Sequence, residues 1–289
     1  DLNKLSEVIK EHKPEIVIHM AAQSLVQESY NDPIETYTTN VLGTTNIMQA
    51  IRDVDFVRVL INVTSDKCYE NRGLERGYNE NDPMGGFDPY SSSKGCAELV
   101  TSSFRNSFFN PTYYEKHGTA IASVRAGNVI GGGDWAKNRI IPDIMKGILE
   151  KTIVKIRNPA AIRPWQFVLE PLNGYMLLAE KLWNDGAKFS EAWNFGPDYT
   201  DVRSVSWLVE KLSQLWNADI NLEYSKEGFH HEASILKLDC NKAKQRLGWQ
   251  PKTNLELGLK FVVEWYKQYK LGNDMKEITE NQITEFSKL

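Results

Sequence analysis

The sequence predicts an α/β fold: a doubly wound parallel sheet accompanied by a smaller C-terminal lobe. Three observations lead to this prediction. Helix-like and strand-like segments alternate through the first two thirds of the chain, as they do in parallel sheets with helical crossovers. A chain of 289 residues is long enough for one large domain or for a domain with a second lobe. From about residue 140, the strand-like segments become short and rich in aromatic residues.

The first segments are a helix, a strand and a long second helix. The stretch LNKLSEVIKEHK repeats apolar residues at helical spacing, and Pro14 ends it. The apolar stretch EIVIHMAA then predicts a strand that ends in small residues. Asn31 and Asp32 cap the next helix, which has Pro33 in its first turn and extends to about Ile51.

The next segments continue the alternation. FVRVLINVTS predicts a second strand, and Asp88 and Pro89 begin a helix that continues past Val100. TAIASVRAGNVIG predicts a further strand, which leads into a glycine-rich loop at residues 131–133. Because helices of this length join consecutive strands, we expect right-handed crossovers and a parallel sheet.

Near residue 140 the strand-like segments become short and rich in aromatic residues, and this change predicts the domain organisation. Residues 1–139 form the sheet domain, and residues 140–289 form mainly the smaller lobe, with some segments returning to the sheet. The later part contains the short strands RPWQFVLE and AWNFGP and helices over Val202–Trp216 and Leu255–Tyr269. The sequence shows no internal repeat and no low-complexity linker, so we expect the two parts to be tightly joined.

Composition and charge exclude several classes of protein. The formal net charge is −4, and the sequence has no basic stripe to meet nucleic-acid phosphates. No apolar stretch approaches the ~20 residues that span a bilayer, so no membrane partner is expected. The cysteines Cys68, Cys96 and Cys240 are scattered and lack CxxC spacing, which indicates reduced thiols in a cytoplasmic protein.

An alcohol, an acid and an amine follow the second predicted strand closely: Thr64, Asp66 and Lys67. One interpretation is a turn with a surface ion pair, which is common and weakly stabilising. The other is a ligand site, because open parallel sheets bind ligands at the carboxyl ends of their strands. These residues alone leave both interpretations open.

Tyr90 and Lys94 lie four residues apart at the start of the helix that follows. Residues at this spacing share one face of a helix, and a lysine cation can lower the pKa of a nearby phenol. The resulting phenolate can take a proton from a hydroxyl group while hydride leaves its carbon. A surface Tyr–Lys pair is the alternative interpretation. The pair lies one element after the Thr64 strand, however, and this position favours a catalytic role.

Seven segments together resemble the CDP-glucose 4,6-dehydratases, which belong to the extended short-chain dehydrogenases/reductases: HMAAQSLVQESYNDPIETYTTNVLGT, TSDKCYEN, DPYSSSKGCAE, SVRAGNVIGGGDW, IRNPAAIRPWQFVLEP, WNFGP and LKLDCNKAKQRLGW. The similarity extends from Asp1 to about Met275. It implies a Rossmann-type sheet that binds NAD and a C-terminal lobe that binds the nucleotide sugar CDP-glucose. It also implies a homo-oligomer, either a dimer or a tetramer.

The resemblance implies roles for the residues already singled out. Tyr90, with Lys94 beside it and Thr64 helping to hold the hydroxyl, takes the C4 hydroxyl proton as hydride moves to NAD. Asp66 is then the acid that protonates the departing C6 hydroxyl, and Lys67 is the candidate base for the C5 proton. NADH returns hydride to C6. The related dTDP-glucose dehydratases have Asp-Glu where this chain has Asp-Lys, and a lysine must be neutral to act as a base.

The resemblance implies further contacts with both ligands. Residues expected near NAD are Ala21, Ala22, Gln23, Asn40 and Arg125, in addition to Thr64, Tyr90 and Lys94. Residues expected near the nucleotide sugar are Asn128, Arg139, Arg163, Trp165 and His231, the two arginines because a guanidinium fits phosphate oxygens. The glycine-rich loop at residues 131–133 is expected on the substrate side. Packing remains an alternative for the alanines and Trp165, and a structural role remains one for Asn40. Adjacent residues of an extended chain point to opposite faces, so no metal site is expected at His230 and His231.

The resemblance also predicts that the chain is an N-terminally truncated family member. Asp1 falls at about the end of the family's third strand, so the glycine-rich turn would precede it. We therefore expect residues 1–289 alone to retain NAD poorly and to be inactive. Other nucleotide-sugar dehydratases, epimerases of the same superfamily and a non-catalytic sugar-nucleotide-binding fragment are the competing interpretations. Epimerisation needs no acid for water loss, so Asp66 and Lys67 favour dehydration.

Overall fold

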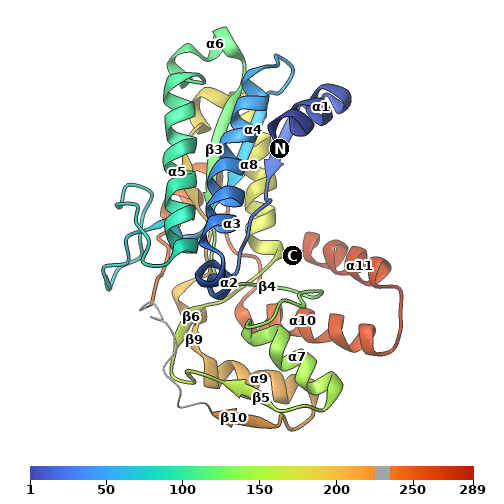
Figure 1. Cartoon of the computed structure of the whole chain (residues 1–289). Coiled ribbons are helices and arrows are strands. Elements are labelled where there is room, and N and C mark those ends of the chain that lie inside the picture. The colour runs from blue at the N-terminus through green and yellow to red at the C-terminus, as the bar shows by residue number, and fades with distance from the viewer. Residues whose placement is uncertain (225–234) are drawn as a thin grey trace. The chain divides into compact units, whose positions relative to one another are not determined.

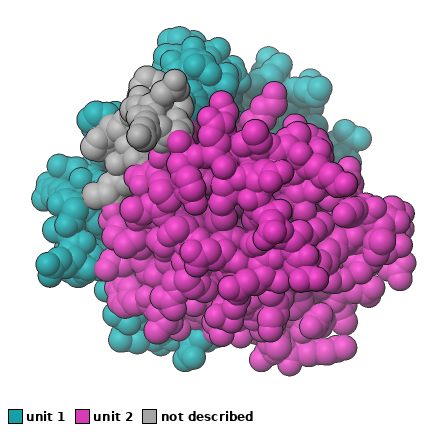
Figure 2. All heavy atoms as spheres, turned by 90° about the horizontal axis from the view of Figure 1, so that it is seen from below, with its two compact units in different colours: residues 1–126, 173–195, 238–250 teal, residues 127–172, 196–237, 251–289 magenta. Residues whose placement is uncertain are grey.

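The computed structural model describes residues 1–224 and 235–289. The chain divides into two compact units, which Figure 2 colours separately. Unit 1 comprises residues 1–126, 173–195 and 238–250, and unit 2 comprises residues 127–172, 196–237 and 251–289. Each unit therefore collects segments that lie far apart in the sequence.

Unit 1 is built on a four-stranded parallel sheet (Figure 1). Its strands are β1 (Ile16–His19), β2 (Val59–Val63), β3 (Ala120–Arg125) and β8 (Ala192–Asn194), in the order β1-β2-β3-β8. All three neighbouring pairs are parallel, and Val59 lies opposite both Ile16 and Ala120. β2 and β3 are buried along nearly their whole length, as expected for strands covered on both faces. The predicted α/β class with a parallel sheet is confirmed.

Helices cover both faces of this sheet, as double winding requires. Ser123 and Arg125 of β3 contact Glu98 of α5 (Pro89–Ser107). Side chains alternate along a strand, so Ala120 points to the opposite face, where Gly186 of α8 (Leu169–Phe189) packs against it. A β-carbon at Gly186 would lie 2.7 Å from that of Ala120, so the glycine lets α8 approach the sheet closely.

The other helical segments of unit 1 are α1 (Leu2–His12), α2 (Val26–Asn31), α3 (Pro33–Tyr37), η1 (Thr38–Leu42), α4 (Gly43–Arg52), η2 (Asp66–Cys68), η3 (Pro111–Tyr113), α6 (Tyr114–His117) and η5 (Ala243–Leu247). One core cluster joins α1 and α4 to the sheet, because Ile9, Ile47 and Met48 pack with Leu60 and Ile121. This burial holds β1 and β2 in place beneath the helices.

The long helix predicted from Asp32 to Ile51 is present, but it is not uniform. Its start agrees with the prediction, because Asp32 caps it by accepting a hydrogen bond of 2.8 Å from the backbone N–H of Glu35. A π-helical turn, η1, then separates α3 from α4. Such turns are rare and often occur at functional positions. In this turn Asn40 is the buried residue.

Unit 2 contains three strand pairs among its described residues. These are β4 (Val129–Ile130) with β7 (Gln166–Phe167), β5 (Val154–Ile156) with β10 (Leu222–Tyr224), and β6 (Ile162–Pro164) with β9 (Val202–Ser204). Its helical segments are α7 (Ile140–Glu150), η4 (Tyr199–Asp201), α9 (Val205–Trp216), α10 (Leu255–Lys270) and α11 (Met275–Ser287). The core is aromatic, and the rings of Phe167 and Phe261 stack with centroids 5.1 Å apart.

The glycine run at residues 131–133, expected to be a substrate-side loop, packs against α10. A β-carbon on Gly132 would lie 2.1 Å from the ring of Trp265, and one on Gly131 would lie 2.9 Å from Val168. These contacts within unit 2 explain why side chains are absent here. The expected role near the substrate stays a prediction.

The short strands and the helices predicted after about residue 140 are present, with two differences. The strand within AWNFGP is β8, which pairs with β3 in the main sheet. The helix expected from Val202 begins at Val205, because residues 202–204 form β9 and Ser204 caps the helix. The assignment of cofactor binding to residues 1–139 and of substrate binding to residues 140–289 stays a prediction. None of the helices in the described residues has the length and apolar character needed to cross a membrane.

Candidate active site

The carboxyl ends of the strands gather most of the predicted site residues of unit 1. Ala21, Ala22 and Gln23 follow β1, Thr64 follows β2, and Arg125 is the last residue of β3. Because these three strands are parallel neighbours, their carboxyl ends lie at one edge of the sheet. The fold thus brings together segments that are separated by up to about a hundred residues in sequence.

The start of α5 places Tyr90 and Lys94 at this edge. Asp88 caps the helix by accepting a hydrogen bond of 2.8 Å from the N–H of Ser91. Tyr90 and Lys94 are both buried, and the Lys94 ammonium lies 3.4 Å from the carbonyl oxygen of Val63, the last residue of β2. Burial lowers the pKa of Lys94 to about 8, although the charge of Glu98 acts in the opposite direction. Lys94 therefore holds its proton at neutral pH but loses it more readily than a surface lysine.

Gly95 lets α5 approach the segment around Gly85, which is hydrogen-bonded to η2. A β-carbon at Gly95 would lie only 2.8 Å from the carbonyl oxygen of Gly85, and 3.4 Å from that of Cys68. Cys68 ends η2, the short 3₁₀ turn that begins at Asp66, and its carbonyl accepts from the N–H of Gly85 over 2.9 Å. The glycine in the YSSSKG segment is thus required by the close approach of the helix to Gly85, and α5 also contacts η2.

Asp66 and Lys67 form an ion pair at the end of β2. The Lys67 ammonium lies 3.3 Å from Oδ2 of Asp66, and the Ser65 hydroxyl donates to Oδ1 over 3.0 Å. Asp66 is only 2% exposed, and its backbone N–H donates to the carbonyl of Ala126 after β3. Sequence reasoning missed Ser65, although its place directly before the acid was the signal that could have found it.

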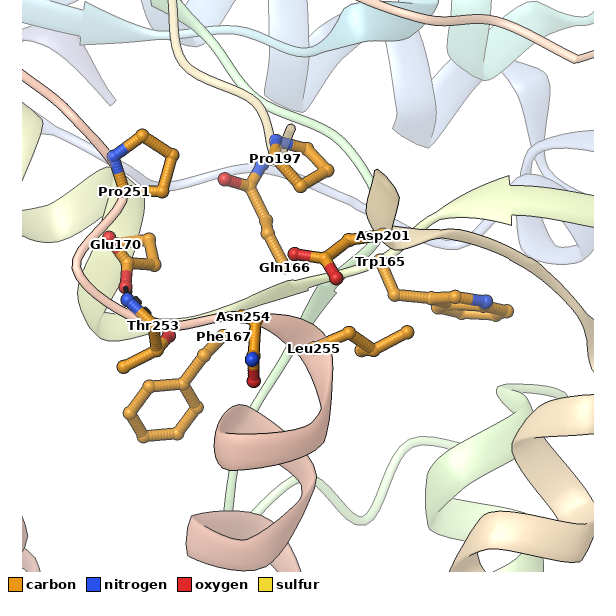
Figure 3. A pocket seen from close by; sticks show the side chains of 10 residues that line it. All are labelled: Trp165, Gln166, Phe167, Glu170, Pro197, Asp201, Pro251, Thr253, Asn254 and Leu255. Atoms are coloured by element: carbon orange, nitrogen blue, oxygen red, sulfur yellow. Dashed lines mark hydrogen bonds between the residues drawn. The ribbon is translucent and has the colours of Figure 1, made fainter. Parts of the chain in front are cut away.

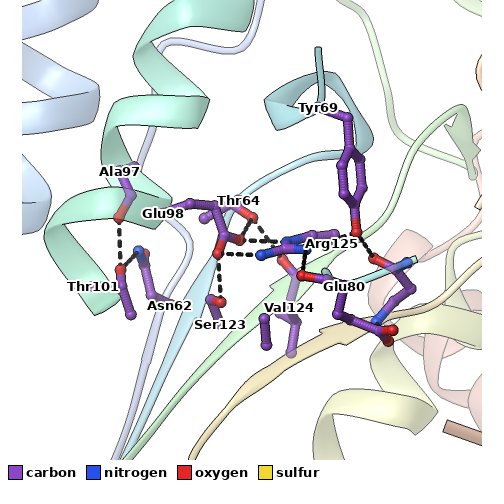
Figure 4. Close-up of polar contacts among 12 residues, drawn as sticks. Asn62, Thr64, Tyr69, Glu80, Ala97, Glu98, Thr101, Ser123, Val124 and Arg125 are labelled. Carbon is purple, nitrogen blue, oxygen red and sulfur yellow. Dashed lines mark hydrogen bonds and ion pairs between the residues drawn. The ribbon is translucent and has the colours of Figure 1, made fainter. Parts of the chain in front are cut away.

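Thr64 belongs to a buried network centred on Glu98 (Figure 4). Its hydroxyl donates to Oε1 of Glu98 over 2.5 Å, and the Ser123 hydroxyl donates to Oε2 over 2.7 Å. The Arg125 guanidinium donates to both oxygens, over 2.9 and 2.8 Å, and also to the Tyr69 hydroxyl over 2.6 Å. In the structure, Thr64 and Arg125 therefore make hydrogen bonds to other side chains of the protein. Their predicted contacts with substrate and NAD stay predictions.

Glu98 is a second residue that sequence reasoning missed. Burial opposes its charged form, but the Arg125 guanidinium and three hydrogen-bond donors hold its pKa below the ordinary value. Arg125 pairs with it so closely that the pKa of Arg125 is raised despite its own burial. Glu98 follows Lys94 by four residues on the same helix face, and this spacing was the available signal.

His19 ends β1 and is a third missed residue. Burial, and then the charge of Lys94, lower its pKa to about 4. The imidazole is therefore neutral at physiological pH. Its position at the carboxyl end of a strand was visible in the sequence, but nothing there indicated its proximity to Lys94.

Asn40 connects the segment after β1 to α5. Its side-chain oxygen accepts from the N–H of Gln23 over 2.9 Å, and its amide nitrogen donates to the Gln23 carbonyl over the same distance. The amide also donates to the Ser93 hydroxyl over 2.8 Å. The π turn presents Asn40 for these contacts, so a structural role is shown by the geometry. Its predicted contact with NAD remains to be tested.

The remaining predicted residues lie in unit 2. Asn128 has a left-handed backbone with φ of 51°, and its carbonyl accepts from the N–H of Gln166 over 3.1 Å. Arg139 pairs with Asp134 over 3.1 Å, and Arg163 donates to the carbonyl of Ile162 over 2.9 Å. His231 lies outside the described residues. The predicted substrate contacts of all these residues stay predictions.

Trp165, the last of the predicted substrate residues, lines a pocket within unit 2. Its indole N–H is buried and finds no hydrogen-bond acceptor among the described residues. Figure 3 shows the side chains around the pocket, which are those of Trp165, Gln166, Phe167, Glu170, Pro197, Asp201, Pro251, Thr253, Asn254 and Leu255. Glu170 is held by the backbone N–H groups of Lys252 and Thr253, so the wall is fixed by hydrogen bonds.

Comparisons of the sequence with known proteins give a consistent result. The family model described as GDP-mannose 4,6 dehydratase matches residues 1–262. A CDP-glucose 4,6-dehydratase from Salmonella typhimurium is 54% identical over 286 residues, which cover 99% of this chain and 80% of that protein. A dTDP-glucose 4,6-dehydratase from Haemophilus influenzae is 23% identical over 285 residues, which cover 92% of this chain and 80% of that protein.

Solved structures confirm the fold. A UDP-glucose 4-epimerase from Thermotoga maritima matches with a TM-score of 0.80 and 23% identity, covering 93% of this chain and 82% of that one. A dTDP-glucose 4,6-dehydratase from Bacillus anthracis, solved in complex with NAD, matches with a TM-score of 0.76 and 23% identity. That match covers 96% of this chain and 80% of the other. The predicted Rossmann-type architecture is thereby confirmed.

Proposed function

The chain belongs to the GDP-mannose 4,6 dehydratase family, and from that membership we propose that it catalyses the NAD-dependent dehydration of CDP-D-glucose to CDP-4-keto-6-deoxy-D-glucose. The substrate follows from the relative with 54% identity. The observation that carries the reaction class is a juxtaposition in unit 1. The helix that bears Tyr90 and Lys94 packs closely on η2, which bears Asp66 and Lys67.

The sheet edge fits a nicotinamide dinucleotide by the chemistry of its side chains. Ala21 and Ala22 follow β1 with small side chains that allow close approach, and Lys94 and Tyr90 supply a cation and a hydroxyl from α5. Lys94 and Gln23 would help to hold the cofactor there. When bound, NAD would supply the hydride chemistry, as acceptor for the hydride of C4 and as donor to C6.

Tyr90 takes the proton of the C4 hydroxyl in this proposal. Lys94 lies four residues away on the same face of α5, and a cation at this spacing can favour the phenolate of a nearby phenol. The 4-keto group formed in this step acidifies the neighbouring C5–H bond. Elimination of water across C5 and C6 then needs one group to take the C5 proton and one to protonate the departing hydroxyl. The Asp66–Lys67 pair supplies one of each.

The ion pair also favours a dehydratase over an epimerase. An epimerase needs oxidation and reduction at one carbon but no group that protonates a leaving hydroxyl. The two charged groups lie 3.3 Å apart in η2, Asp66 buried and Lys67 partly exposed, so both groups reach one region of the site. In unit 2, we assign Asn128, Arg139 and Arg163 to the diphosphate and Trp165 to the region of the base. His231, which is also predicted to contact the substrate, lies outside the described residues.

Two finer proposals concern assembly and location. Ile34, Leu42 and Leu99 are exposed apolar residues on the neighbouring helices α3, η1 and α5, which supports a homodimer or a tetramer. Cys68, Cys96 and Cys240 are free thiols, which supports a cytoplasmic location. Light scattering of the purified protein measures the first, and a fluorescent fusion in intact cells measures the second.

The test of the proposed function is direct conversion of substrate. The purified full-length protein is incubated with CDP-glucose and NAD, and the nucleotide sugar is analysed by mass spectrometry and NMR. A product lighter by one water supports the dehydratase. A product of unchanged mass with inverted stereochemistry at C4 supports the epimerase instead. Unchanged CDP-glucose at saturating NAD contradicts both.

A further inference from the structure

The short turn that bears Asp66 and Lys67 is held together only weakly by its own backbone. Two long hydrogen bonds close η2, 3.3 Å from the N–H of Cys68 to the carbonyl of Ser65 and 3.4 Å from the N–H of Tyr69 to that of Asp66. A 3₁₀ turn has poor hydrogen-bond geometry, and bonds of this length are weak. The positions of the two charged side chains therefore depend on what anchors the ends of the turn.

Both ends of η2 are anchored to the carboxyl ends of the strands. At its start, the N–H of Asp66 donates to the carbonyl of Ala126 over 3.1 Å. At its end, the hydroxyl of Tyr69, which caps the turn, accepts a hydrogen bond of 2.6 Å from the Arg125 guanidinium (Figure 4). The same hydroxyl donates over 2.8 Å to the side-chain oxygen of Asn194. Tyr69 is thus tied to the last residues of β3 and β8, two neighbouring strands of the sheet.

The two partners of the Tyr69 hydroxyl are themselves fixed. Arg125 forms the buried ion pair with Glu98 of α5, and the Asn194 amide donates over 2.9 Å to the carbonyl of Tyr78. Burial raises the pKa of Tyr69, so its hydroxyl keeps the proton that it donates to Asn194. The end of η2 is therefore held by a rigid set of hydrogen bonds.

The hydroxyl of Tyr69 is not needed for packing. The rings of Tyr69 and Tyr78 have centroids 5.4 Å apart, and a phenylalanine at position 69 would keep that contact. We propose that Tyr69 is a positioning residue for the elimination of water, whose hydroxyl fixes η2 and with it the Asp66–Lys67 pair. Because Tyr69 is only 1% exposed, it acts through η2 and not by contact with the sugar. This inference rests on the proposed dehydratase function.

The oxidation step draws on a different element of unit 1. Tyr90 and Lys94, which we assign to that step, lie on α5, and this helix has its own N-terminal cap. The Asp66–Lys67 pair lies on η2. Removal of the Tyr69 hydroxyl releases the end of η2 and leaves the cap of α5 intact. We therefore expect elimination to slow while oxidation of C4 continues.

The variant Tyr69→Phe separates the two steps. The full-length protein with NAD is mixed with CDP-glucose in a single turnover, in which NADH absorbance measures oxidation and mass spectrometry of quenched samples measures the loss of water. Oxidation should stay within about threefold of the parental rate and water loss should slow about ten- to a hundredfold, because a misplacement of about 1 Å can cost about a hundredfold. The ratio of the two rates does not depend on the folded fraction of the protein, so partial unfolding cannot imitate this result.

Exchange of the C5 proton gives a second readout, which needs no hydride transfer. The protein is incubated in D₂O with CDP-4-keto-6-deoxy-glucose, and deuterium at C5 is followed by NMR against an enzyme-free blank. The group that takes this proton lies on η2 in the proposed function. Exchange in Tyr69→Phe should therefore slow by about the same factor as water loss.

Two controls isolate the hydroxyl. Incorporation of 3-fluorotyrosine at position 69 keeps both the ring and the hydroxyl, so it should restore water loss and C5 exchange to the parental rates. Tyr175→Phe is the matched control, because it removes the hydroxyl of another buried tyrosine of unit 1, on α8. It should retain the parental rates of oxidation, water loss and exchange.

The outcomes separate the inference from the function on which it rests. Oxidation and water loss that slow equally in Tyr69→Phe overturn the inference, and so do two rates that both stay parental. Failure of 3-fluorotyrosine to restore water loss also overturns it. If the parent protein dehydrates CDP-glucose, the proposed function stands in each of these cases. If it does not, the proposed function fails, and the role of Tyr69 fails with it.

Discussion

Replacement of Glu98 by glutamine should destabilise the protein strongly, because it breaks a buried ion pair. The two side chains of the pair are each 4% exposed, and the Glu98 carboxylate accepts four hydrogen bonds, from Thr64, Ser123 and twice from Arg125. Glutamine has the same shape, but its amide nitrogen cannot accept, so two of the four donors lose their acceptor. Arg125 then loses the carboxylate with which it forms its buried ion pair.

The expected loss in the free energy of unfolding is about 3–5 kcal/mol, the usual consequence of removing one partner of a buried pair. At about 2–4 °C per kcal/mol, this predicts a fall in melting temperature of about 6–20 °C. Thermal and urea melts followed by circular dichroism measure both quantities. Glu210→Gln, an exposed glutamate on α9, is the matched control and should melt within about a degree of the parent protein.

The double variant Glu98→Gln/Arg125→Met tests the cause. It removes both charges, so most of the lost stability should return. If Glu98→Gln costs less than about 1 kcal/mol, the ion pair is not the anchor that its burial indicates. If the double variant is less stable than the single one, the hydrogen bonds of Arg125 with Tyr69 matter more than the charge pair.

Three further predictions concern activity. Tyr90→Phe should reduce turnover by about two to four powers of ten with an unchanged melting temperature, and near-parental turnover would remove Tyr90 from the oxidation step. Oxidation of C4 should slow as the pH rises past about 8, where Lys94 loses its proton. An oxidation rate that still rises at pH 9.5 would contradict this expectation. In the unfolded chain Lys94 keeps its proton up to about pH 10.5, so between about pH 8 and pH 10.5 the unfolded state binds more protons than the folded state. The contribution of Lys94 to the free energy of unfolding should therefore rise with pH in this range. Values of kcat/KM should rank CDP-glucose above dTDP- and UDP-glucose, and equal values for all three would refute the selectivity.

The fold could be predicted because its signals are local. Helical spacing, Pro33 and Pro89 at helix starts, and the apolar runs of β2 and β3 each act within a few residues. The placement of β8 beside β3 could not be predicted this way, because the pairing joins segments about seventy residues apart and depends on which strand edge is open.

The site could be predicted only in part. The common placement of Tyr90 and Lys94 on α5 could be predicted because residues four apart share one face of a helix. Glu98 and Ser65 were missed because their importance depends on partners brought together by the sheet, such as Arg125 and Asp66. The π turn at Asn40 was also hidden, since its sequence continues an ordinary helical pattern.

The most direct test of the proposed reaction follows one hydrogen atom through it. CDP-glucose carrying deuterium at C4 is incubated with the protein and NAD, and the product is analysed by NMR and mass spectrometry. We expect a 4-keto-6-deoxy sugar with the deuterium at C6, because the hydride taken from C4 returns to C6 of the same molecule. A product that retains deuterium at C4, or one that loses it to solvent, would contradict the proposed reaction.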